Sequence, residues 1–204
     1  MRLSEVFAEA DGFSMRTHAP DVAWLMARQV LVSDFAEFMR EYIYVVVASG
    51  FRGAVAATLT DRLHACLDFE AGVIKESMES IFKNKAKTLA ITKTFYSLKD
   101  NYEDASKEWR VPADLQALPF IGPTTCWHLA RNIGLQSSVK PDLHMKRLFN
   151  RLFKRSDASF IQERIVELAK ALGQPPGVVD FKLWVYLSHE GKVKDCCNGG
   201  QRLR

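Results

Sequence analysis

The chain has 204 residues, of which 48% are hydrophobic and 25% are charged, a balance that is typical of a globular protein. No apolar run approaches the roughly 20 residues that a membrane-spanning helix needs. The N-terminus also lacks the basic and apolar stretches of a secretory signal. We therefore expect an intracellular protein without a membrane partner.

The cysteines offer little support for a metal site. Cys66 and Cys126 stand alone, Cys196 and Cys197 are adjacent, and no pair has Cys-x-x-Cys spacing. This pattern argues against zinc and iron–sulfur clusters and favours reduced thiols.

Charge is divided unevenly along the chain. The net charge is +4, but residues 1–109 hold 13 Lys and Arg against 16 Asp and Glu, whereas residues 110–204 hold 15 against 8. The second half thus has the basic composition of a polyanion binder. Ordinary solvated helix faces would give the same composition, so charge alone leaves both interpretations open.

Nearly every segment has the spacing of a helix. Helices are predicted over residues 19–32, 35–49, 55–67, 72–81, 84–96, 111–118, 123–133, 142–153, 159–172 and 179–189. Tyr42–Val47 is β-branched enough for a strand, but its surroundings favour a helix. Residues 1–15 and 195–204 are expected to be loosely held ends, and residues 100–106 a polar connection.

The predicted helix over 84–96 has two distinct sides. Its apolar residues are Ala86, Leu89 and Ala90. Its basic face consists of Lys83, Lys85, Lys87 and Lys93. That face suits contact with phosphates, and it would equally suit plain solvation.

The most informative stretch begins with a short helix, a tight turn and a second helix. The turn Pro119-Phe120-Ile121-Gly122 leads into the second helix, which Gly134 closes as a C-cap. Free backbone N–H groups and the helix dipole at such a helix start favour an anion, and a DNA phosphate would fit. Gly122 permits close backbone approach. This contact would be independent of base identity.

Asp142 follows Lys140-Pro141, a pair that favours an extended approach to the next helix. Capping that helix is the ordinary structural role for Asp142. A functional role is compatible with it, because one carboxylate oxygen can cap the helix while the other faces a bound sugar.

These residues together resemble a known signature. Leu118-Pro119-Phe120-Ile121-Gly122-Pro123-Thr124-Thr125, followed by Lys140-Pro141-Asp142-Leu143-His144 and Arg147-Leu148, is similar to the helix-hairpin-helix and aspartate motif of the endonuclease III–like DNA glycosylase superfamily. Weaker similarities lie at Asn84-Lys85-Ala86-Lys87 and from Leu183-Trp184 to His189-Glu190-Gly191. The resemblance covers roughly residues 35–195 and is strong only over 115–152.

The resemblance implies an all-α, two-lobed glycosylase fold with the active site in a cleft between the lobes. Residues 1–204 would form one domain. One lobe would span about 35–134, including the hairpin at 115–134, and the other would combine 1–34 with 135–204.

The implied activity is excision of a damaged or modified base that is flipped out of double-stranded DNA. Asp142 would be the catalytic carboxylate, stabilising the positive charge that builds on the sugar as the N-glycosidic bond breaks. We expect a monomer without a required cofactor. In this family the hairpin often holds a monovalent cation, K⁺ or Na⁺, through backbone carbonyls, and the matching positions are Gln116, Leu118 and Ile121.

The resemblance also assigns expected roles in DNA binding. The residues expected to contact DNA are Phe120, Ile121, Gly122, Thr124, Thr125, Lys85, Lys140, His144 and Arg147. Phe51 and Arg52 stand where the family places a side chain that fills the gap left by a flipped base. Trp127 and Trp184 are candidates for stacking on that base, with core packing as the commoner alternative.

Two departures from the pattern bear on the activity. Thr124 occupies the position of the hairpin lysine with which bifunctional members also nick the strand, and Phe120 replaces the first hairpin glycine. We therefore expect a monofunctional glycosylase. The alternatives are a glycosylase/lyase using Lys140 or another lysine, and a non-catalytic DNA-binding protein. Alkylated, oxidised, deaminated and bulky phage bases all remain open as substrates.

Overall fold

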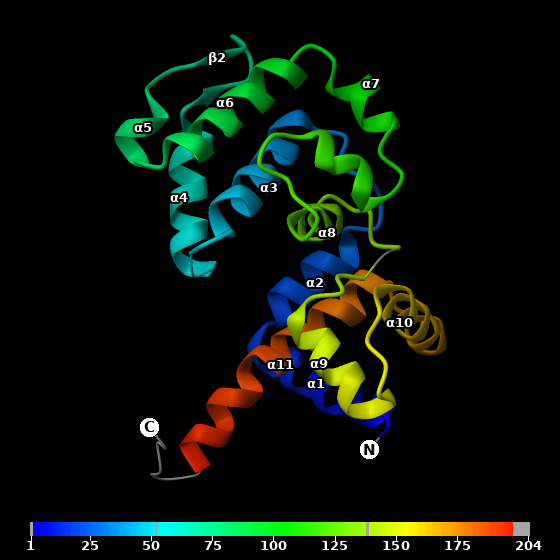
Figure 1. Ribbon diagram of the computed structural model, residues 1–204. Coiled ribbons are helices and arrows are strands. Elements are labelled where there is room, and N and C mark those ends of the chain that lie inside the picture. The colour runs from blue at the N-terminus through cyan, green and yellow to red at the C-terminus, as the bar shows by residue number, and fades with distance from the viewer. Residues whose placement is uncertain (1, 52, 138, 198–204) are drawn as a thin grey trace. The chain divides into compact units, whose positions relative to one another are not determined.

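The computed structural model describes residues 2–51, 53–137 and 139–197, with the side chains of residues 190–197 left aside. The chain divides into two compact units, which are described separately below. Unit 1 comprises Met1–Gln29 and Gln136–Arg204, and unit 2 comprises Val30–Leu135. The structure is helical, as the sequence predicts, and Figure 1 shows the order of the elements.

Unit 2 contains helices and one short antiparallel strand pair, β1 with β2, in which Leu67 pairs with Ile74. Its elements are α3 (Phe35–Ala48), α4 (Gly53–Ala65), β1 (Leu67–Asp68), β2 (Val73–Ile74), α5 (Met78–Ile81), α6 (Lys85–Leu98), α7 (Tyr102–Lys107), the 3₁₀ helix η1 (Pro112–Ala117) and α8 (Thr125–Asn132).

Helix α3 forms the centre of unit 2. The Asp34 side chain caps its start by accepting a hydrogen bond from the Glu37 N–H. The segment Tyr42–Val47 is helical despite its β-branched residues, because the helix packs against α4, α6 and α8 and buries both Phe38 and Tyr42 completely. Tertiary packing thus outweighs local propensity here.

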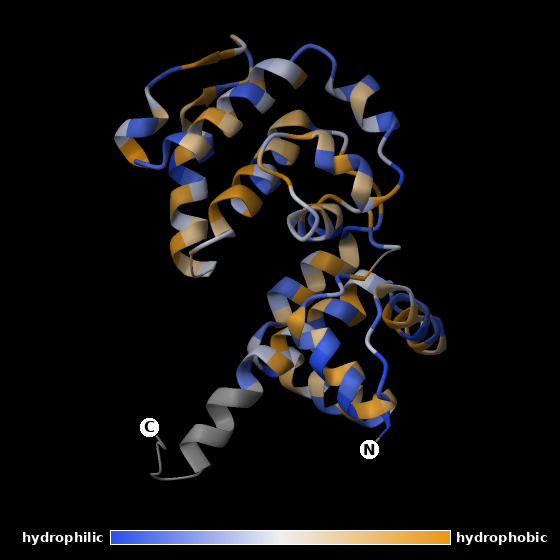
Figure 2. Ribbon diagram, viewed as in Figure 1, coloured by the Kyte–Doolittle hydropathy of each residue, from blue (hydrophilic) through white to orange (hydrophobic). Residues whose placement is uncertain are grey.

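Unit 1 is built from α1 (Leu3–Thr17), α2 (Ala19–Ala27), α9 (Leu143–Phe153), α10 (Ala158–Leu172) and α11 (Pro176–Cys197). Helix α10 illustrates how sequence specifies these elements. Asp157 caps its start, Ile161, Ile165 and Ala169 line its buried side at intervals of four residues, and Gly173 closes it with a left-handed φ of 64°. Figure 2 shows such bands of apolar and polar residues along the helices.

Three expectations about secondary structure are wrong. Residues 1–15 are not a loose end, because Leu3, Val6, Phe7 and Ala10 form a buried stripe on α1. Residues 72–81 are not one helix, because Gly72, with a left-handed φ of 64°, ends the turn before β2, and only Met78–Ile81 is helical. Residues 100–106 are more than a connection, because α7 buries Tyr102.

Several predicted helix ends also shift. Helix α2 stops at Ala27 rather than residue 32, and the Val32 N–H bonds instead to the Ile133 carbonyl. Helix α11 starts at Pro176 and extends to Cys197, so residues 195–197 are helical, while residues 198–204 lie outside the described residues. Gly134 does follow α8, with a φ of 101° and its Cα close against the Val30 carbonyl.

None of the helices within the described ranges combines the length and apolarity that crossing a membrane requires.

Candidate functional site

The hairpin predicted from the sequence is formed in unit 2 by η1, a tight turn and α8. Its first element is a 3₁₀ helix, and its second begins at Thr125, two residues later than predicted. The Ile121 N–H bonds to the Leu118 carbonyl at 3.1 Å, and the Gly122 N–H bonds to the Thr125 hydroxyl oxygen at 2.8 Å. These bonds fix the turn that leads into α8.

The start of α8 leaves backbone donors exposed. Thr124 is the N-cap residue, yet its side chain accepts no hydrogen bond from the helix. The N–H groups of Thr124 and Thr125 donate to no other described residue. Because unpaired N–H groups at a helix start carry partial positive charge, this end of α8 can receive an anion.

Tyr42 of α3 forms a hydrogen bond with the hairpin turn. Its hydroxyl donates a hydrogen bond to the Pro119 carbonyl at 2.5 Å, and burial raises the pKa of Tyr42 well above its ordinary value. The side chain is fully buried, so this bond ties the turn to α3 in an apolar setting. Sequence reasoning did not assign Tyr42 a role, because a tyrosine in an apolar run gives no local sign of its partner.

Phe120 keeps the backbone conformation that its glycine-like position calls for. Its φ is 64°, in the left-handed region, and its side chain is 44% exposed. The ring therefore does not pack into the core. A left-handed conformation costs a non-glycine residue roughly 1–2 kcal/mol, so the position is strained.

Lys87 is not part of a solvated basic face. It is only 4% exposed, and its Nζ donates to the Val47 carbonyl at 3.1 Å, near the end of α3. The buried side of α6 includes Lys87, Ile91 and Phe95, whereas Leu89 is exposed. Ala90 is buried and Lys83, Lys85 and Lys93 are exposed as predicted, whereas Ala86, Leu89 and Lys87 depart from the prediction. The four-residue spacing of 87, 91 and 95 was the pattern that could have corrected it.

The gap-filling candidates lie just after α3. Phe51 is 43% exposed, so it is available at the surface rather than packed in the core. Arg52 lies outside the described residues. Lys85 is exposed at the start of α6, and Trp127 of α8 is half-buried against the core of unit 2.

Asp142 lies in unit 1 and caps α9, as the sequence predicts. Its Oδ1 accepts hydrogen bonds from the N–H groups of His144 at 2.9 Å and Met145 at 3.1 Å. Its Oδ2 takes no part in the cap and lies 3.8 Å from the Lys140 Nζ. The carboxylate is 11% exposed, so one oxygen is committed to structure and the other is held beside an ammonium group.

Basic residues follow Asp142 on α9. Lys146 and Arg147 are both exposed, and neither has a carboxylate within ion-pair distance among the described side chains. Unit 1 as a whole carries 16 Lys and Arg against 11 Asp and Glu in its sequence. The carboxylate therefore belongs to the unit with the basic excess.

The remaining predicted residues have mainly structural contacts. His144 is half-buried and contributes its backbone N–H to the Asp142 cap. Trp184 of α11 is half-buried next to Phe181, with ring centroids 6.3 Å apart. Gln116 is exposed, and Leu118 and Ile121 are buried. Across the described ranges no group of three or more His, Cys, Asp or Glu side chains is arranged to hold a metal ion.

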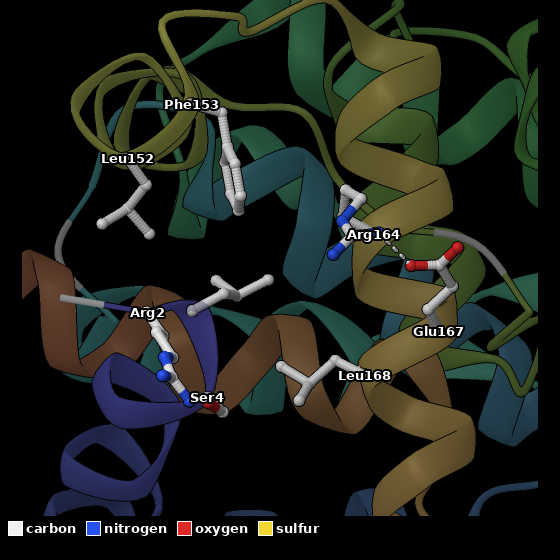
Figure 3. A pocket seen from close by; sticks show the side chains of 8 residues that line it. Arg2, Ser4, Leu152, Phe153, Arg164, Glu167 and Leu168 are labelled. Carbon is white, nitrogen blue, oxygen red and sulfur yellow. Dashed lines mark hydrogen bonds and ion pairs between the residues drawn. The ribbon is translucent and has the colours of Figure 1, made fainter.

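A cavity of about 470 Å³ lies elsewhere in unit 1 (Figure 3). Its lining residues are Arg2, Leu3, Ser4, Leu152, Phe153, Arg164, Glu167 and Leu168. None of them is a predicted site residue, and Arg164 is already paired with Glu167 at 2.5 Å. Its guanidinium is therefore committed to Glu167, and the cavity adds no chemistry to the residues described above.

The fold matches solved structures of DNA glycosylases. The 8-oxoguanine DNA glycosylase of Thermotoga maritima aligns over 91% of this chain and 97% of its own, with 17% identity and a TM-score of 0.62. The 8-oxoguanine glycosylase/lyase of Methanocaldococcus jannaschii, in complex with a 15mer DNA containing 8-oxoguanine, aligns over 88% and 95%, with 14% identity and a TM-score of 0.62. No protein-family model and no curated protein matches the chain.

The two glycosylase structures establish the fold of this chain. Within that fold, Asp142, Lys140 and His144 come together in unit 1, and the hairpin residues, Phe51 and Lys87 belong to unit 2.

Proposed function

We propose that the protein is a DNA glycosylase that hydrolyses the N-glycosidic bond of a flipped base, with Asp142 as the catalytic carboxylate. The observation that carries this proposal is the divided use of the Asp142 carboxylate. Oδ1 is bound by two backbone N–H groups, while Oδ2 remains available for chemistry beside Lys140. The glycosylase fold gives this arrangement its context.

The chemistry needs a fixed negative charge. As the base departs, positive charge develops on the sugar, and a carboxylate held in place stabilises it or orients the attacking water. The cap holds the Asp142 side chain in one rotamer without reorganisation during the reaction. The Lys140 ammonium lies 3.8 Å from the Asp142 Oδ2. It would also be able to pair with a DNA phosphate next to the sugar.

DNA binding is assigned to the two groups of donors. The open N–H groups of Thr124 and Thr125 would receive one phosphate, and the exposed Lys85, Lys146 and Arg147 would contact others. These phosphate contacts carry no sequence information. Because they release counterions from the DNA, we expect affinity to fall steeply with salt.

We further propose that the enzyme is monofunctional and leaves an intact abasic site. Thr124 offers a hydroxyl, which does not form a Schiff base, at the position of the hairpin lysine. The Methanocaldococcus jannaschii protein is a glycosylase/lyase, so a similar fold also accommodates the lyase type.

A second candidate function is a glycosylase/lyase that uses Lys140, and one observation favours it. The Lys140 Nζ lies 3.8 Å from the Asp142 Oδ2, so the lysine and the carboxylate could reach the same sugar. The amine would then attack C1′ as the base leaves, and cleavage of the C1′–O4′ bond, with protonation of O4′, would convert the adduct into an imine. Removal of a C2′ proton would then expel the 3′ phosphate.

The test is a panel of duplexes that each carry one modified base. 8-oxoguanine comes first, because both similar structures are enzymes named for it. Wild type, Asp142→Asn and Lys140→Met are incubated with each duplex and analysed with and without hot alkali. We expect strand breaks only after alkali, lost in Asp142→Asn and retained in Lys140→Met.

Other results would redirect the assignment. Breaks without alkali, with a borohydride-trapped adduct that Lys140→Met abolishes, would replace the monofunctional proposal with the lyase. Tight DNA binding with no base released from any duplex, including genomic DNA with bulky phage bases, would indicate a non-catalytic binding protein.

A further inference from the structure

Three phenylalanine rings surround the buried ammonium of Lys87 in unit 2. The Lys87 Nζ lies 5.4 Å from the ring centre of Phe51, 5.5 Å from that of Phe120 and 5.9 Å from that of Phe82. These distances are within the range of cation–π attraction. The residues come from the segment after α3, the hairpin turn and the segment before α6, so Lys87 gathers three distant parts of the chain.

The rings differ in their exposure. Phe82 is 7% exposed and belongs to the core, whereas Phe51 and Phe120 are 43% and 44% exposed. Both exposed ring centres lie within 5.5 Å of the Lys87 Nζ, and we call these two rings the Phe51–Phe120 pair. The two exposed rings thus share one buried cation.

The backbone at Phe120 indicates that its ring is used. Its φ of 64° is strained for phenylalanine and would be relaxed for glycine. The ring gains no core packing in return, because it is 44% exposed. Strain that is retained without a structural benefit is characteristic of functional positions.

The occupant must suit the neighbouring hairpin. Phe120 lies within the turn that ends at the open N–H groups of Thr124 and Thr125, which are suited to a phosphate. A nucleic acid held there brings planar bases with it, and every base has a face that stacks on an aromatic ring. Because Lys87 attracts both rings, less conformational entropy of their side chains would be lost when a base stacks on them.

We propose that the Phe51–Phe120 pair is a stacking surface for an unpaired nucleobase of bound DNA, with Lys87 as a positioning residue. This inference rests on the proposed function, because it requires DNA at the hairpin. It extends that function by assigning to Phe120, which stands in place of a glycine, a preference for DNA that contains an unpaired base.

The experiment compares two fluorescently labelled duplexes, one fully paired and one with a single bulged thymine, by anisotropy titration. We expect wild type to prefer the bulged duplex by roughly 5- to 150-fold, the range for one base stacking on an aromatic side chain. Phe120→Leu keeps an apolar side chain but removes the ring, and should lower affinity for the bulged duplex much more than affinity for the paired duplex, so that most of this preference is lost.

Tyr96→Leu is the matched control. Tyr96 is 46% exposed on α6 with the Lys99 Nζ 5.7 Å from its ring centre, so it reproduces an exposed ring beside a lysine away from the hairpin. This variant should keep the full preference. Lys87→Met should lower the preference and Lys87→Arg restore it, because arginine also supplies a cation to the rings.

Several outcomes would overturn the stacking surface: no preference in wild type, an undiminished preference in Phe120→Leu, or an equal loss on both duplexes. Base release in the duplex panel is measured independently. Base release without a bulge preference would contradict the stacking surface and leave the glycosylase proposal standing. A bulge preference without base release would contradict the glycosylase proposal and leave the stacking surface standing.

Discussion

Two helix starts in this chain handle the same physical problem differently. Helix α9 begins with backbone N–H groups that the Asp142 carboxylate satisfies, whereas α8 begins at Thr124 with no side-chain cap. The start of α9 therefore already contains its anion. The start of α8 still has donors to offer, which makes it the better place for a phosphate.

This difference suggests a division of labour between binding and chemistry. Helices α3 and α10 also begin with a capping aspartate, Asp34 and Asp157. The second oxygen of Asp157 also lies beside a cation, Arg155, so what distinguishes Asp142 from Asp157 is its burial: its side chain is 11% exposed, compared with 45% for Asp157. The open start of α8 and the buried carboxylate at the start of α9 are therefore the two features that the following experiments compare.

The largest predicted effect separates catalysis from capping at Asp142. Asparagine is a good N-cap, so Asp142→Asn should fold with a free energy of unfolding within about 0.5 kcal/mol of wild type. Base release should nevertheless fall by roughly 10²- to 10³-fold or more, because the charge that stabilises the reacting sugar is lost. Single-turnover base release and denaturant unfolding measure the two quantities.

Asp157→Asn is the matched control, because Asp157 caps α10 in the same unit by accepting a hydrogen bond from the Phe160 N–H. It should leave base release unchanged. Equal losses of activity in both variants would mean that Asp142 acts only as a cap.

The next effect concerns the support of the open helix start. Tyr42→Phe removes the hydrogen bond to the Pro119 carbonyl, and Tyr102→Phe removes an equivalent bond to the Val32 carbonyl. Both tyrosines are buried, so each variant should lose about 1–2 kcal/mol of stability. Only Tyr42 holds the hairpin, so only Tyr42→Phe should weaken DNA binding, by roughly 3- to 10-fold if about 1 kcal/mol is transmitted.

Equilibrium unfolding and DNA titration of the two variants decide this prediction. Unchanged DNA affinity in Tyr42→Phe, at the same loss of stability as Tyr102→Phe, would show that the turn is rigid without its tyrosine.

Local signals in the sequence predicted the parts of the fold that depend on local physics. Helical spacing placed the helices that begin near residues 35, 143 and 158 almost to the residue, and Asp142 was predicted as the cap of the second of them. The same logic located Asp142 and the hairpin. It failed at Gly72, whose left-handed φ interrupts an otherwise helical pattern.

The rest of the site depends on contacts that no local pattern encodes. Lys87 is buried because the end of α3 supplies carbonyl acceptors 40 residues away in sequence. Tyr42 meets Pro119 across 77 residues. A lysine within an apolar stripe and a tyrosine within an apolar run are ambiguous until the tertiary structure provides their partners.

The pH dependence of stability should report the burial of Lys87. Burial lowers the pKa of its ammonium below the ordinary 10.5. Between the folded-state pKa and 10.5, the unfolded chain binds a proton that the folded chain has released, so stability contributed by this group rises with pH. The free energy of unfolding of wild type, minus that of Lys87→Met, should therefore increase as pH approaches 10.5 from below.

Taking this difference removes the opposing contribution of Tyr42 and Tyr102, whose pKa values are raised by burial and which destabilise the fold at alkaline pH in both proteins. A difference that stays flat with pH would place the ammonium in water rather than among the rings.

The smallest effect concerns two residues with a left-handed backbone conformation, one before α8 and one after α9. Phe120 has a φ of 64° and Lys154, the C-cap of α9, has a φ of 57°. Replacing either with glycine relieves roughly 1–2 kcal/mol of backbone strain in the folded state. Glycine also loses more conformational entropy on folding, which costs about 0.5–1 kcal/mol, so each variant should be more stable by about 0.5–1 kcal/mol. Thermal unfolding is sensitive enough to measure such a shift.

The two variants should differ in DNA binding. Phe120→Gly should lose the preference for a bulged duplex, whereas Lys154→Gly should keep it, because only Phe120 has its ring beside Lys87. A gain in stability with loss of binding at residue 120 alone would show that its strain is retained for the ring. A loss of stability in Phe120→Gly would mean instead that the exposed ring contributes more to the fold than its strain costs.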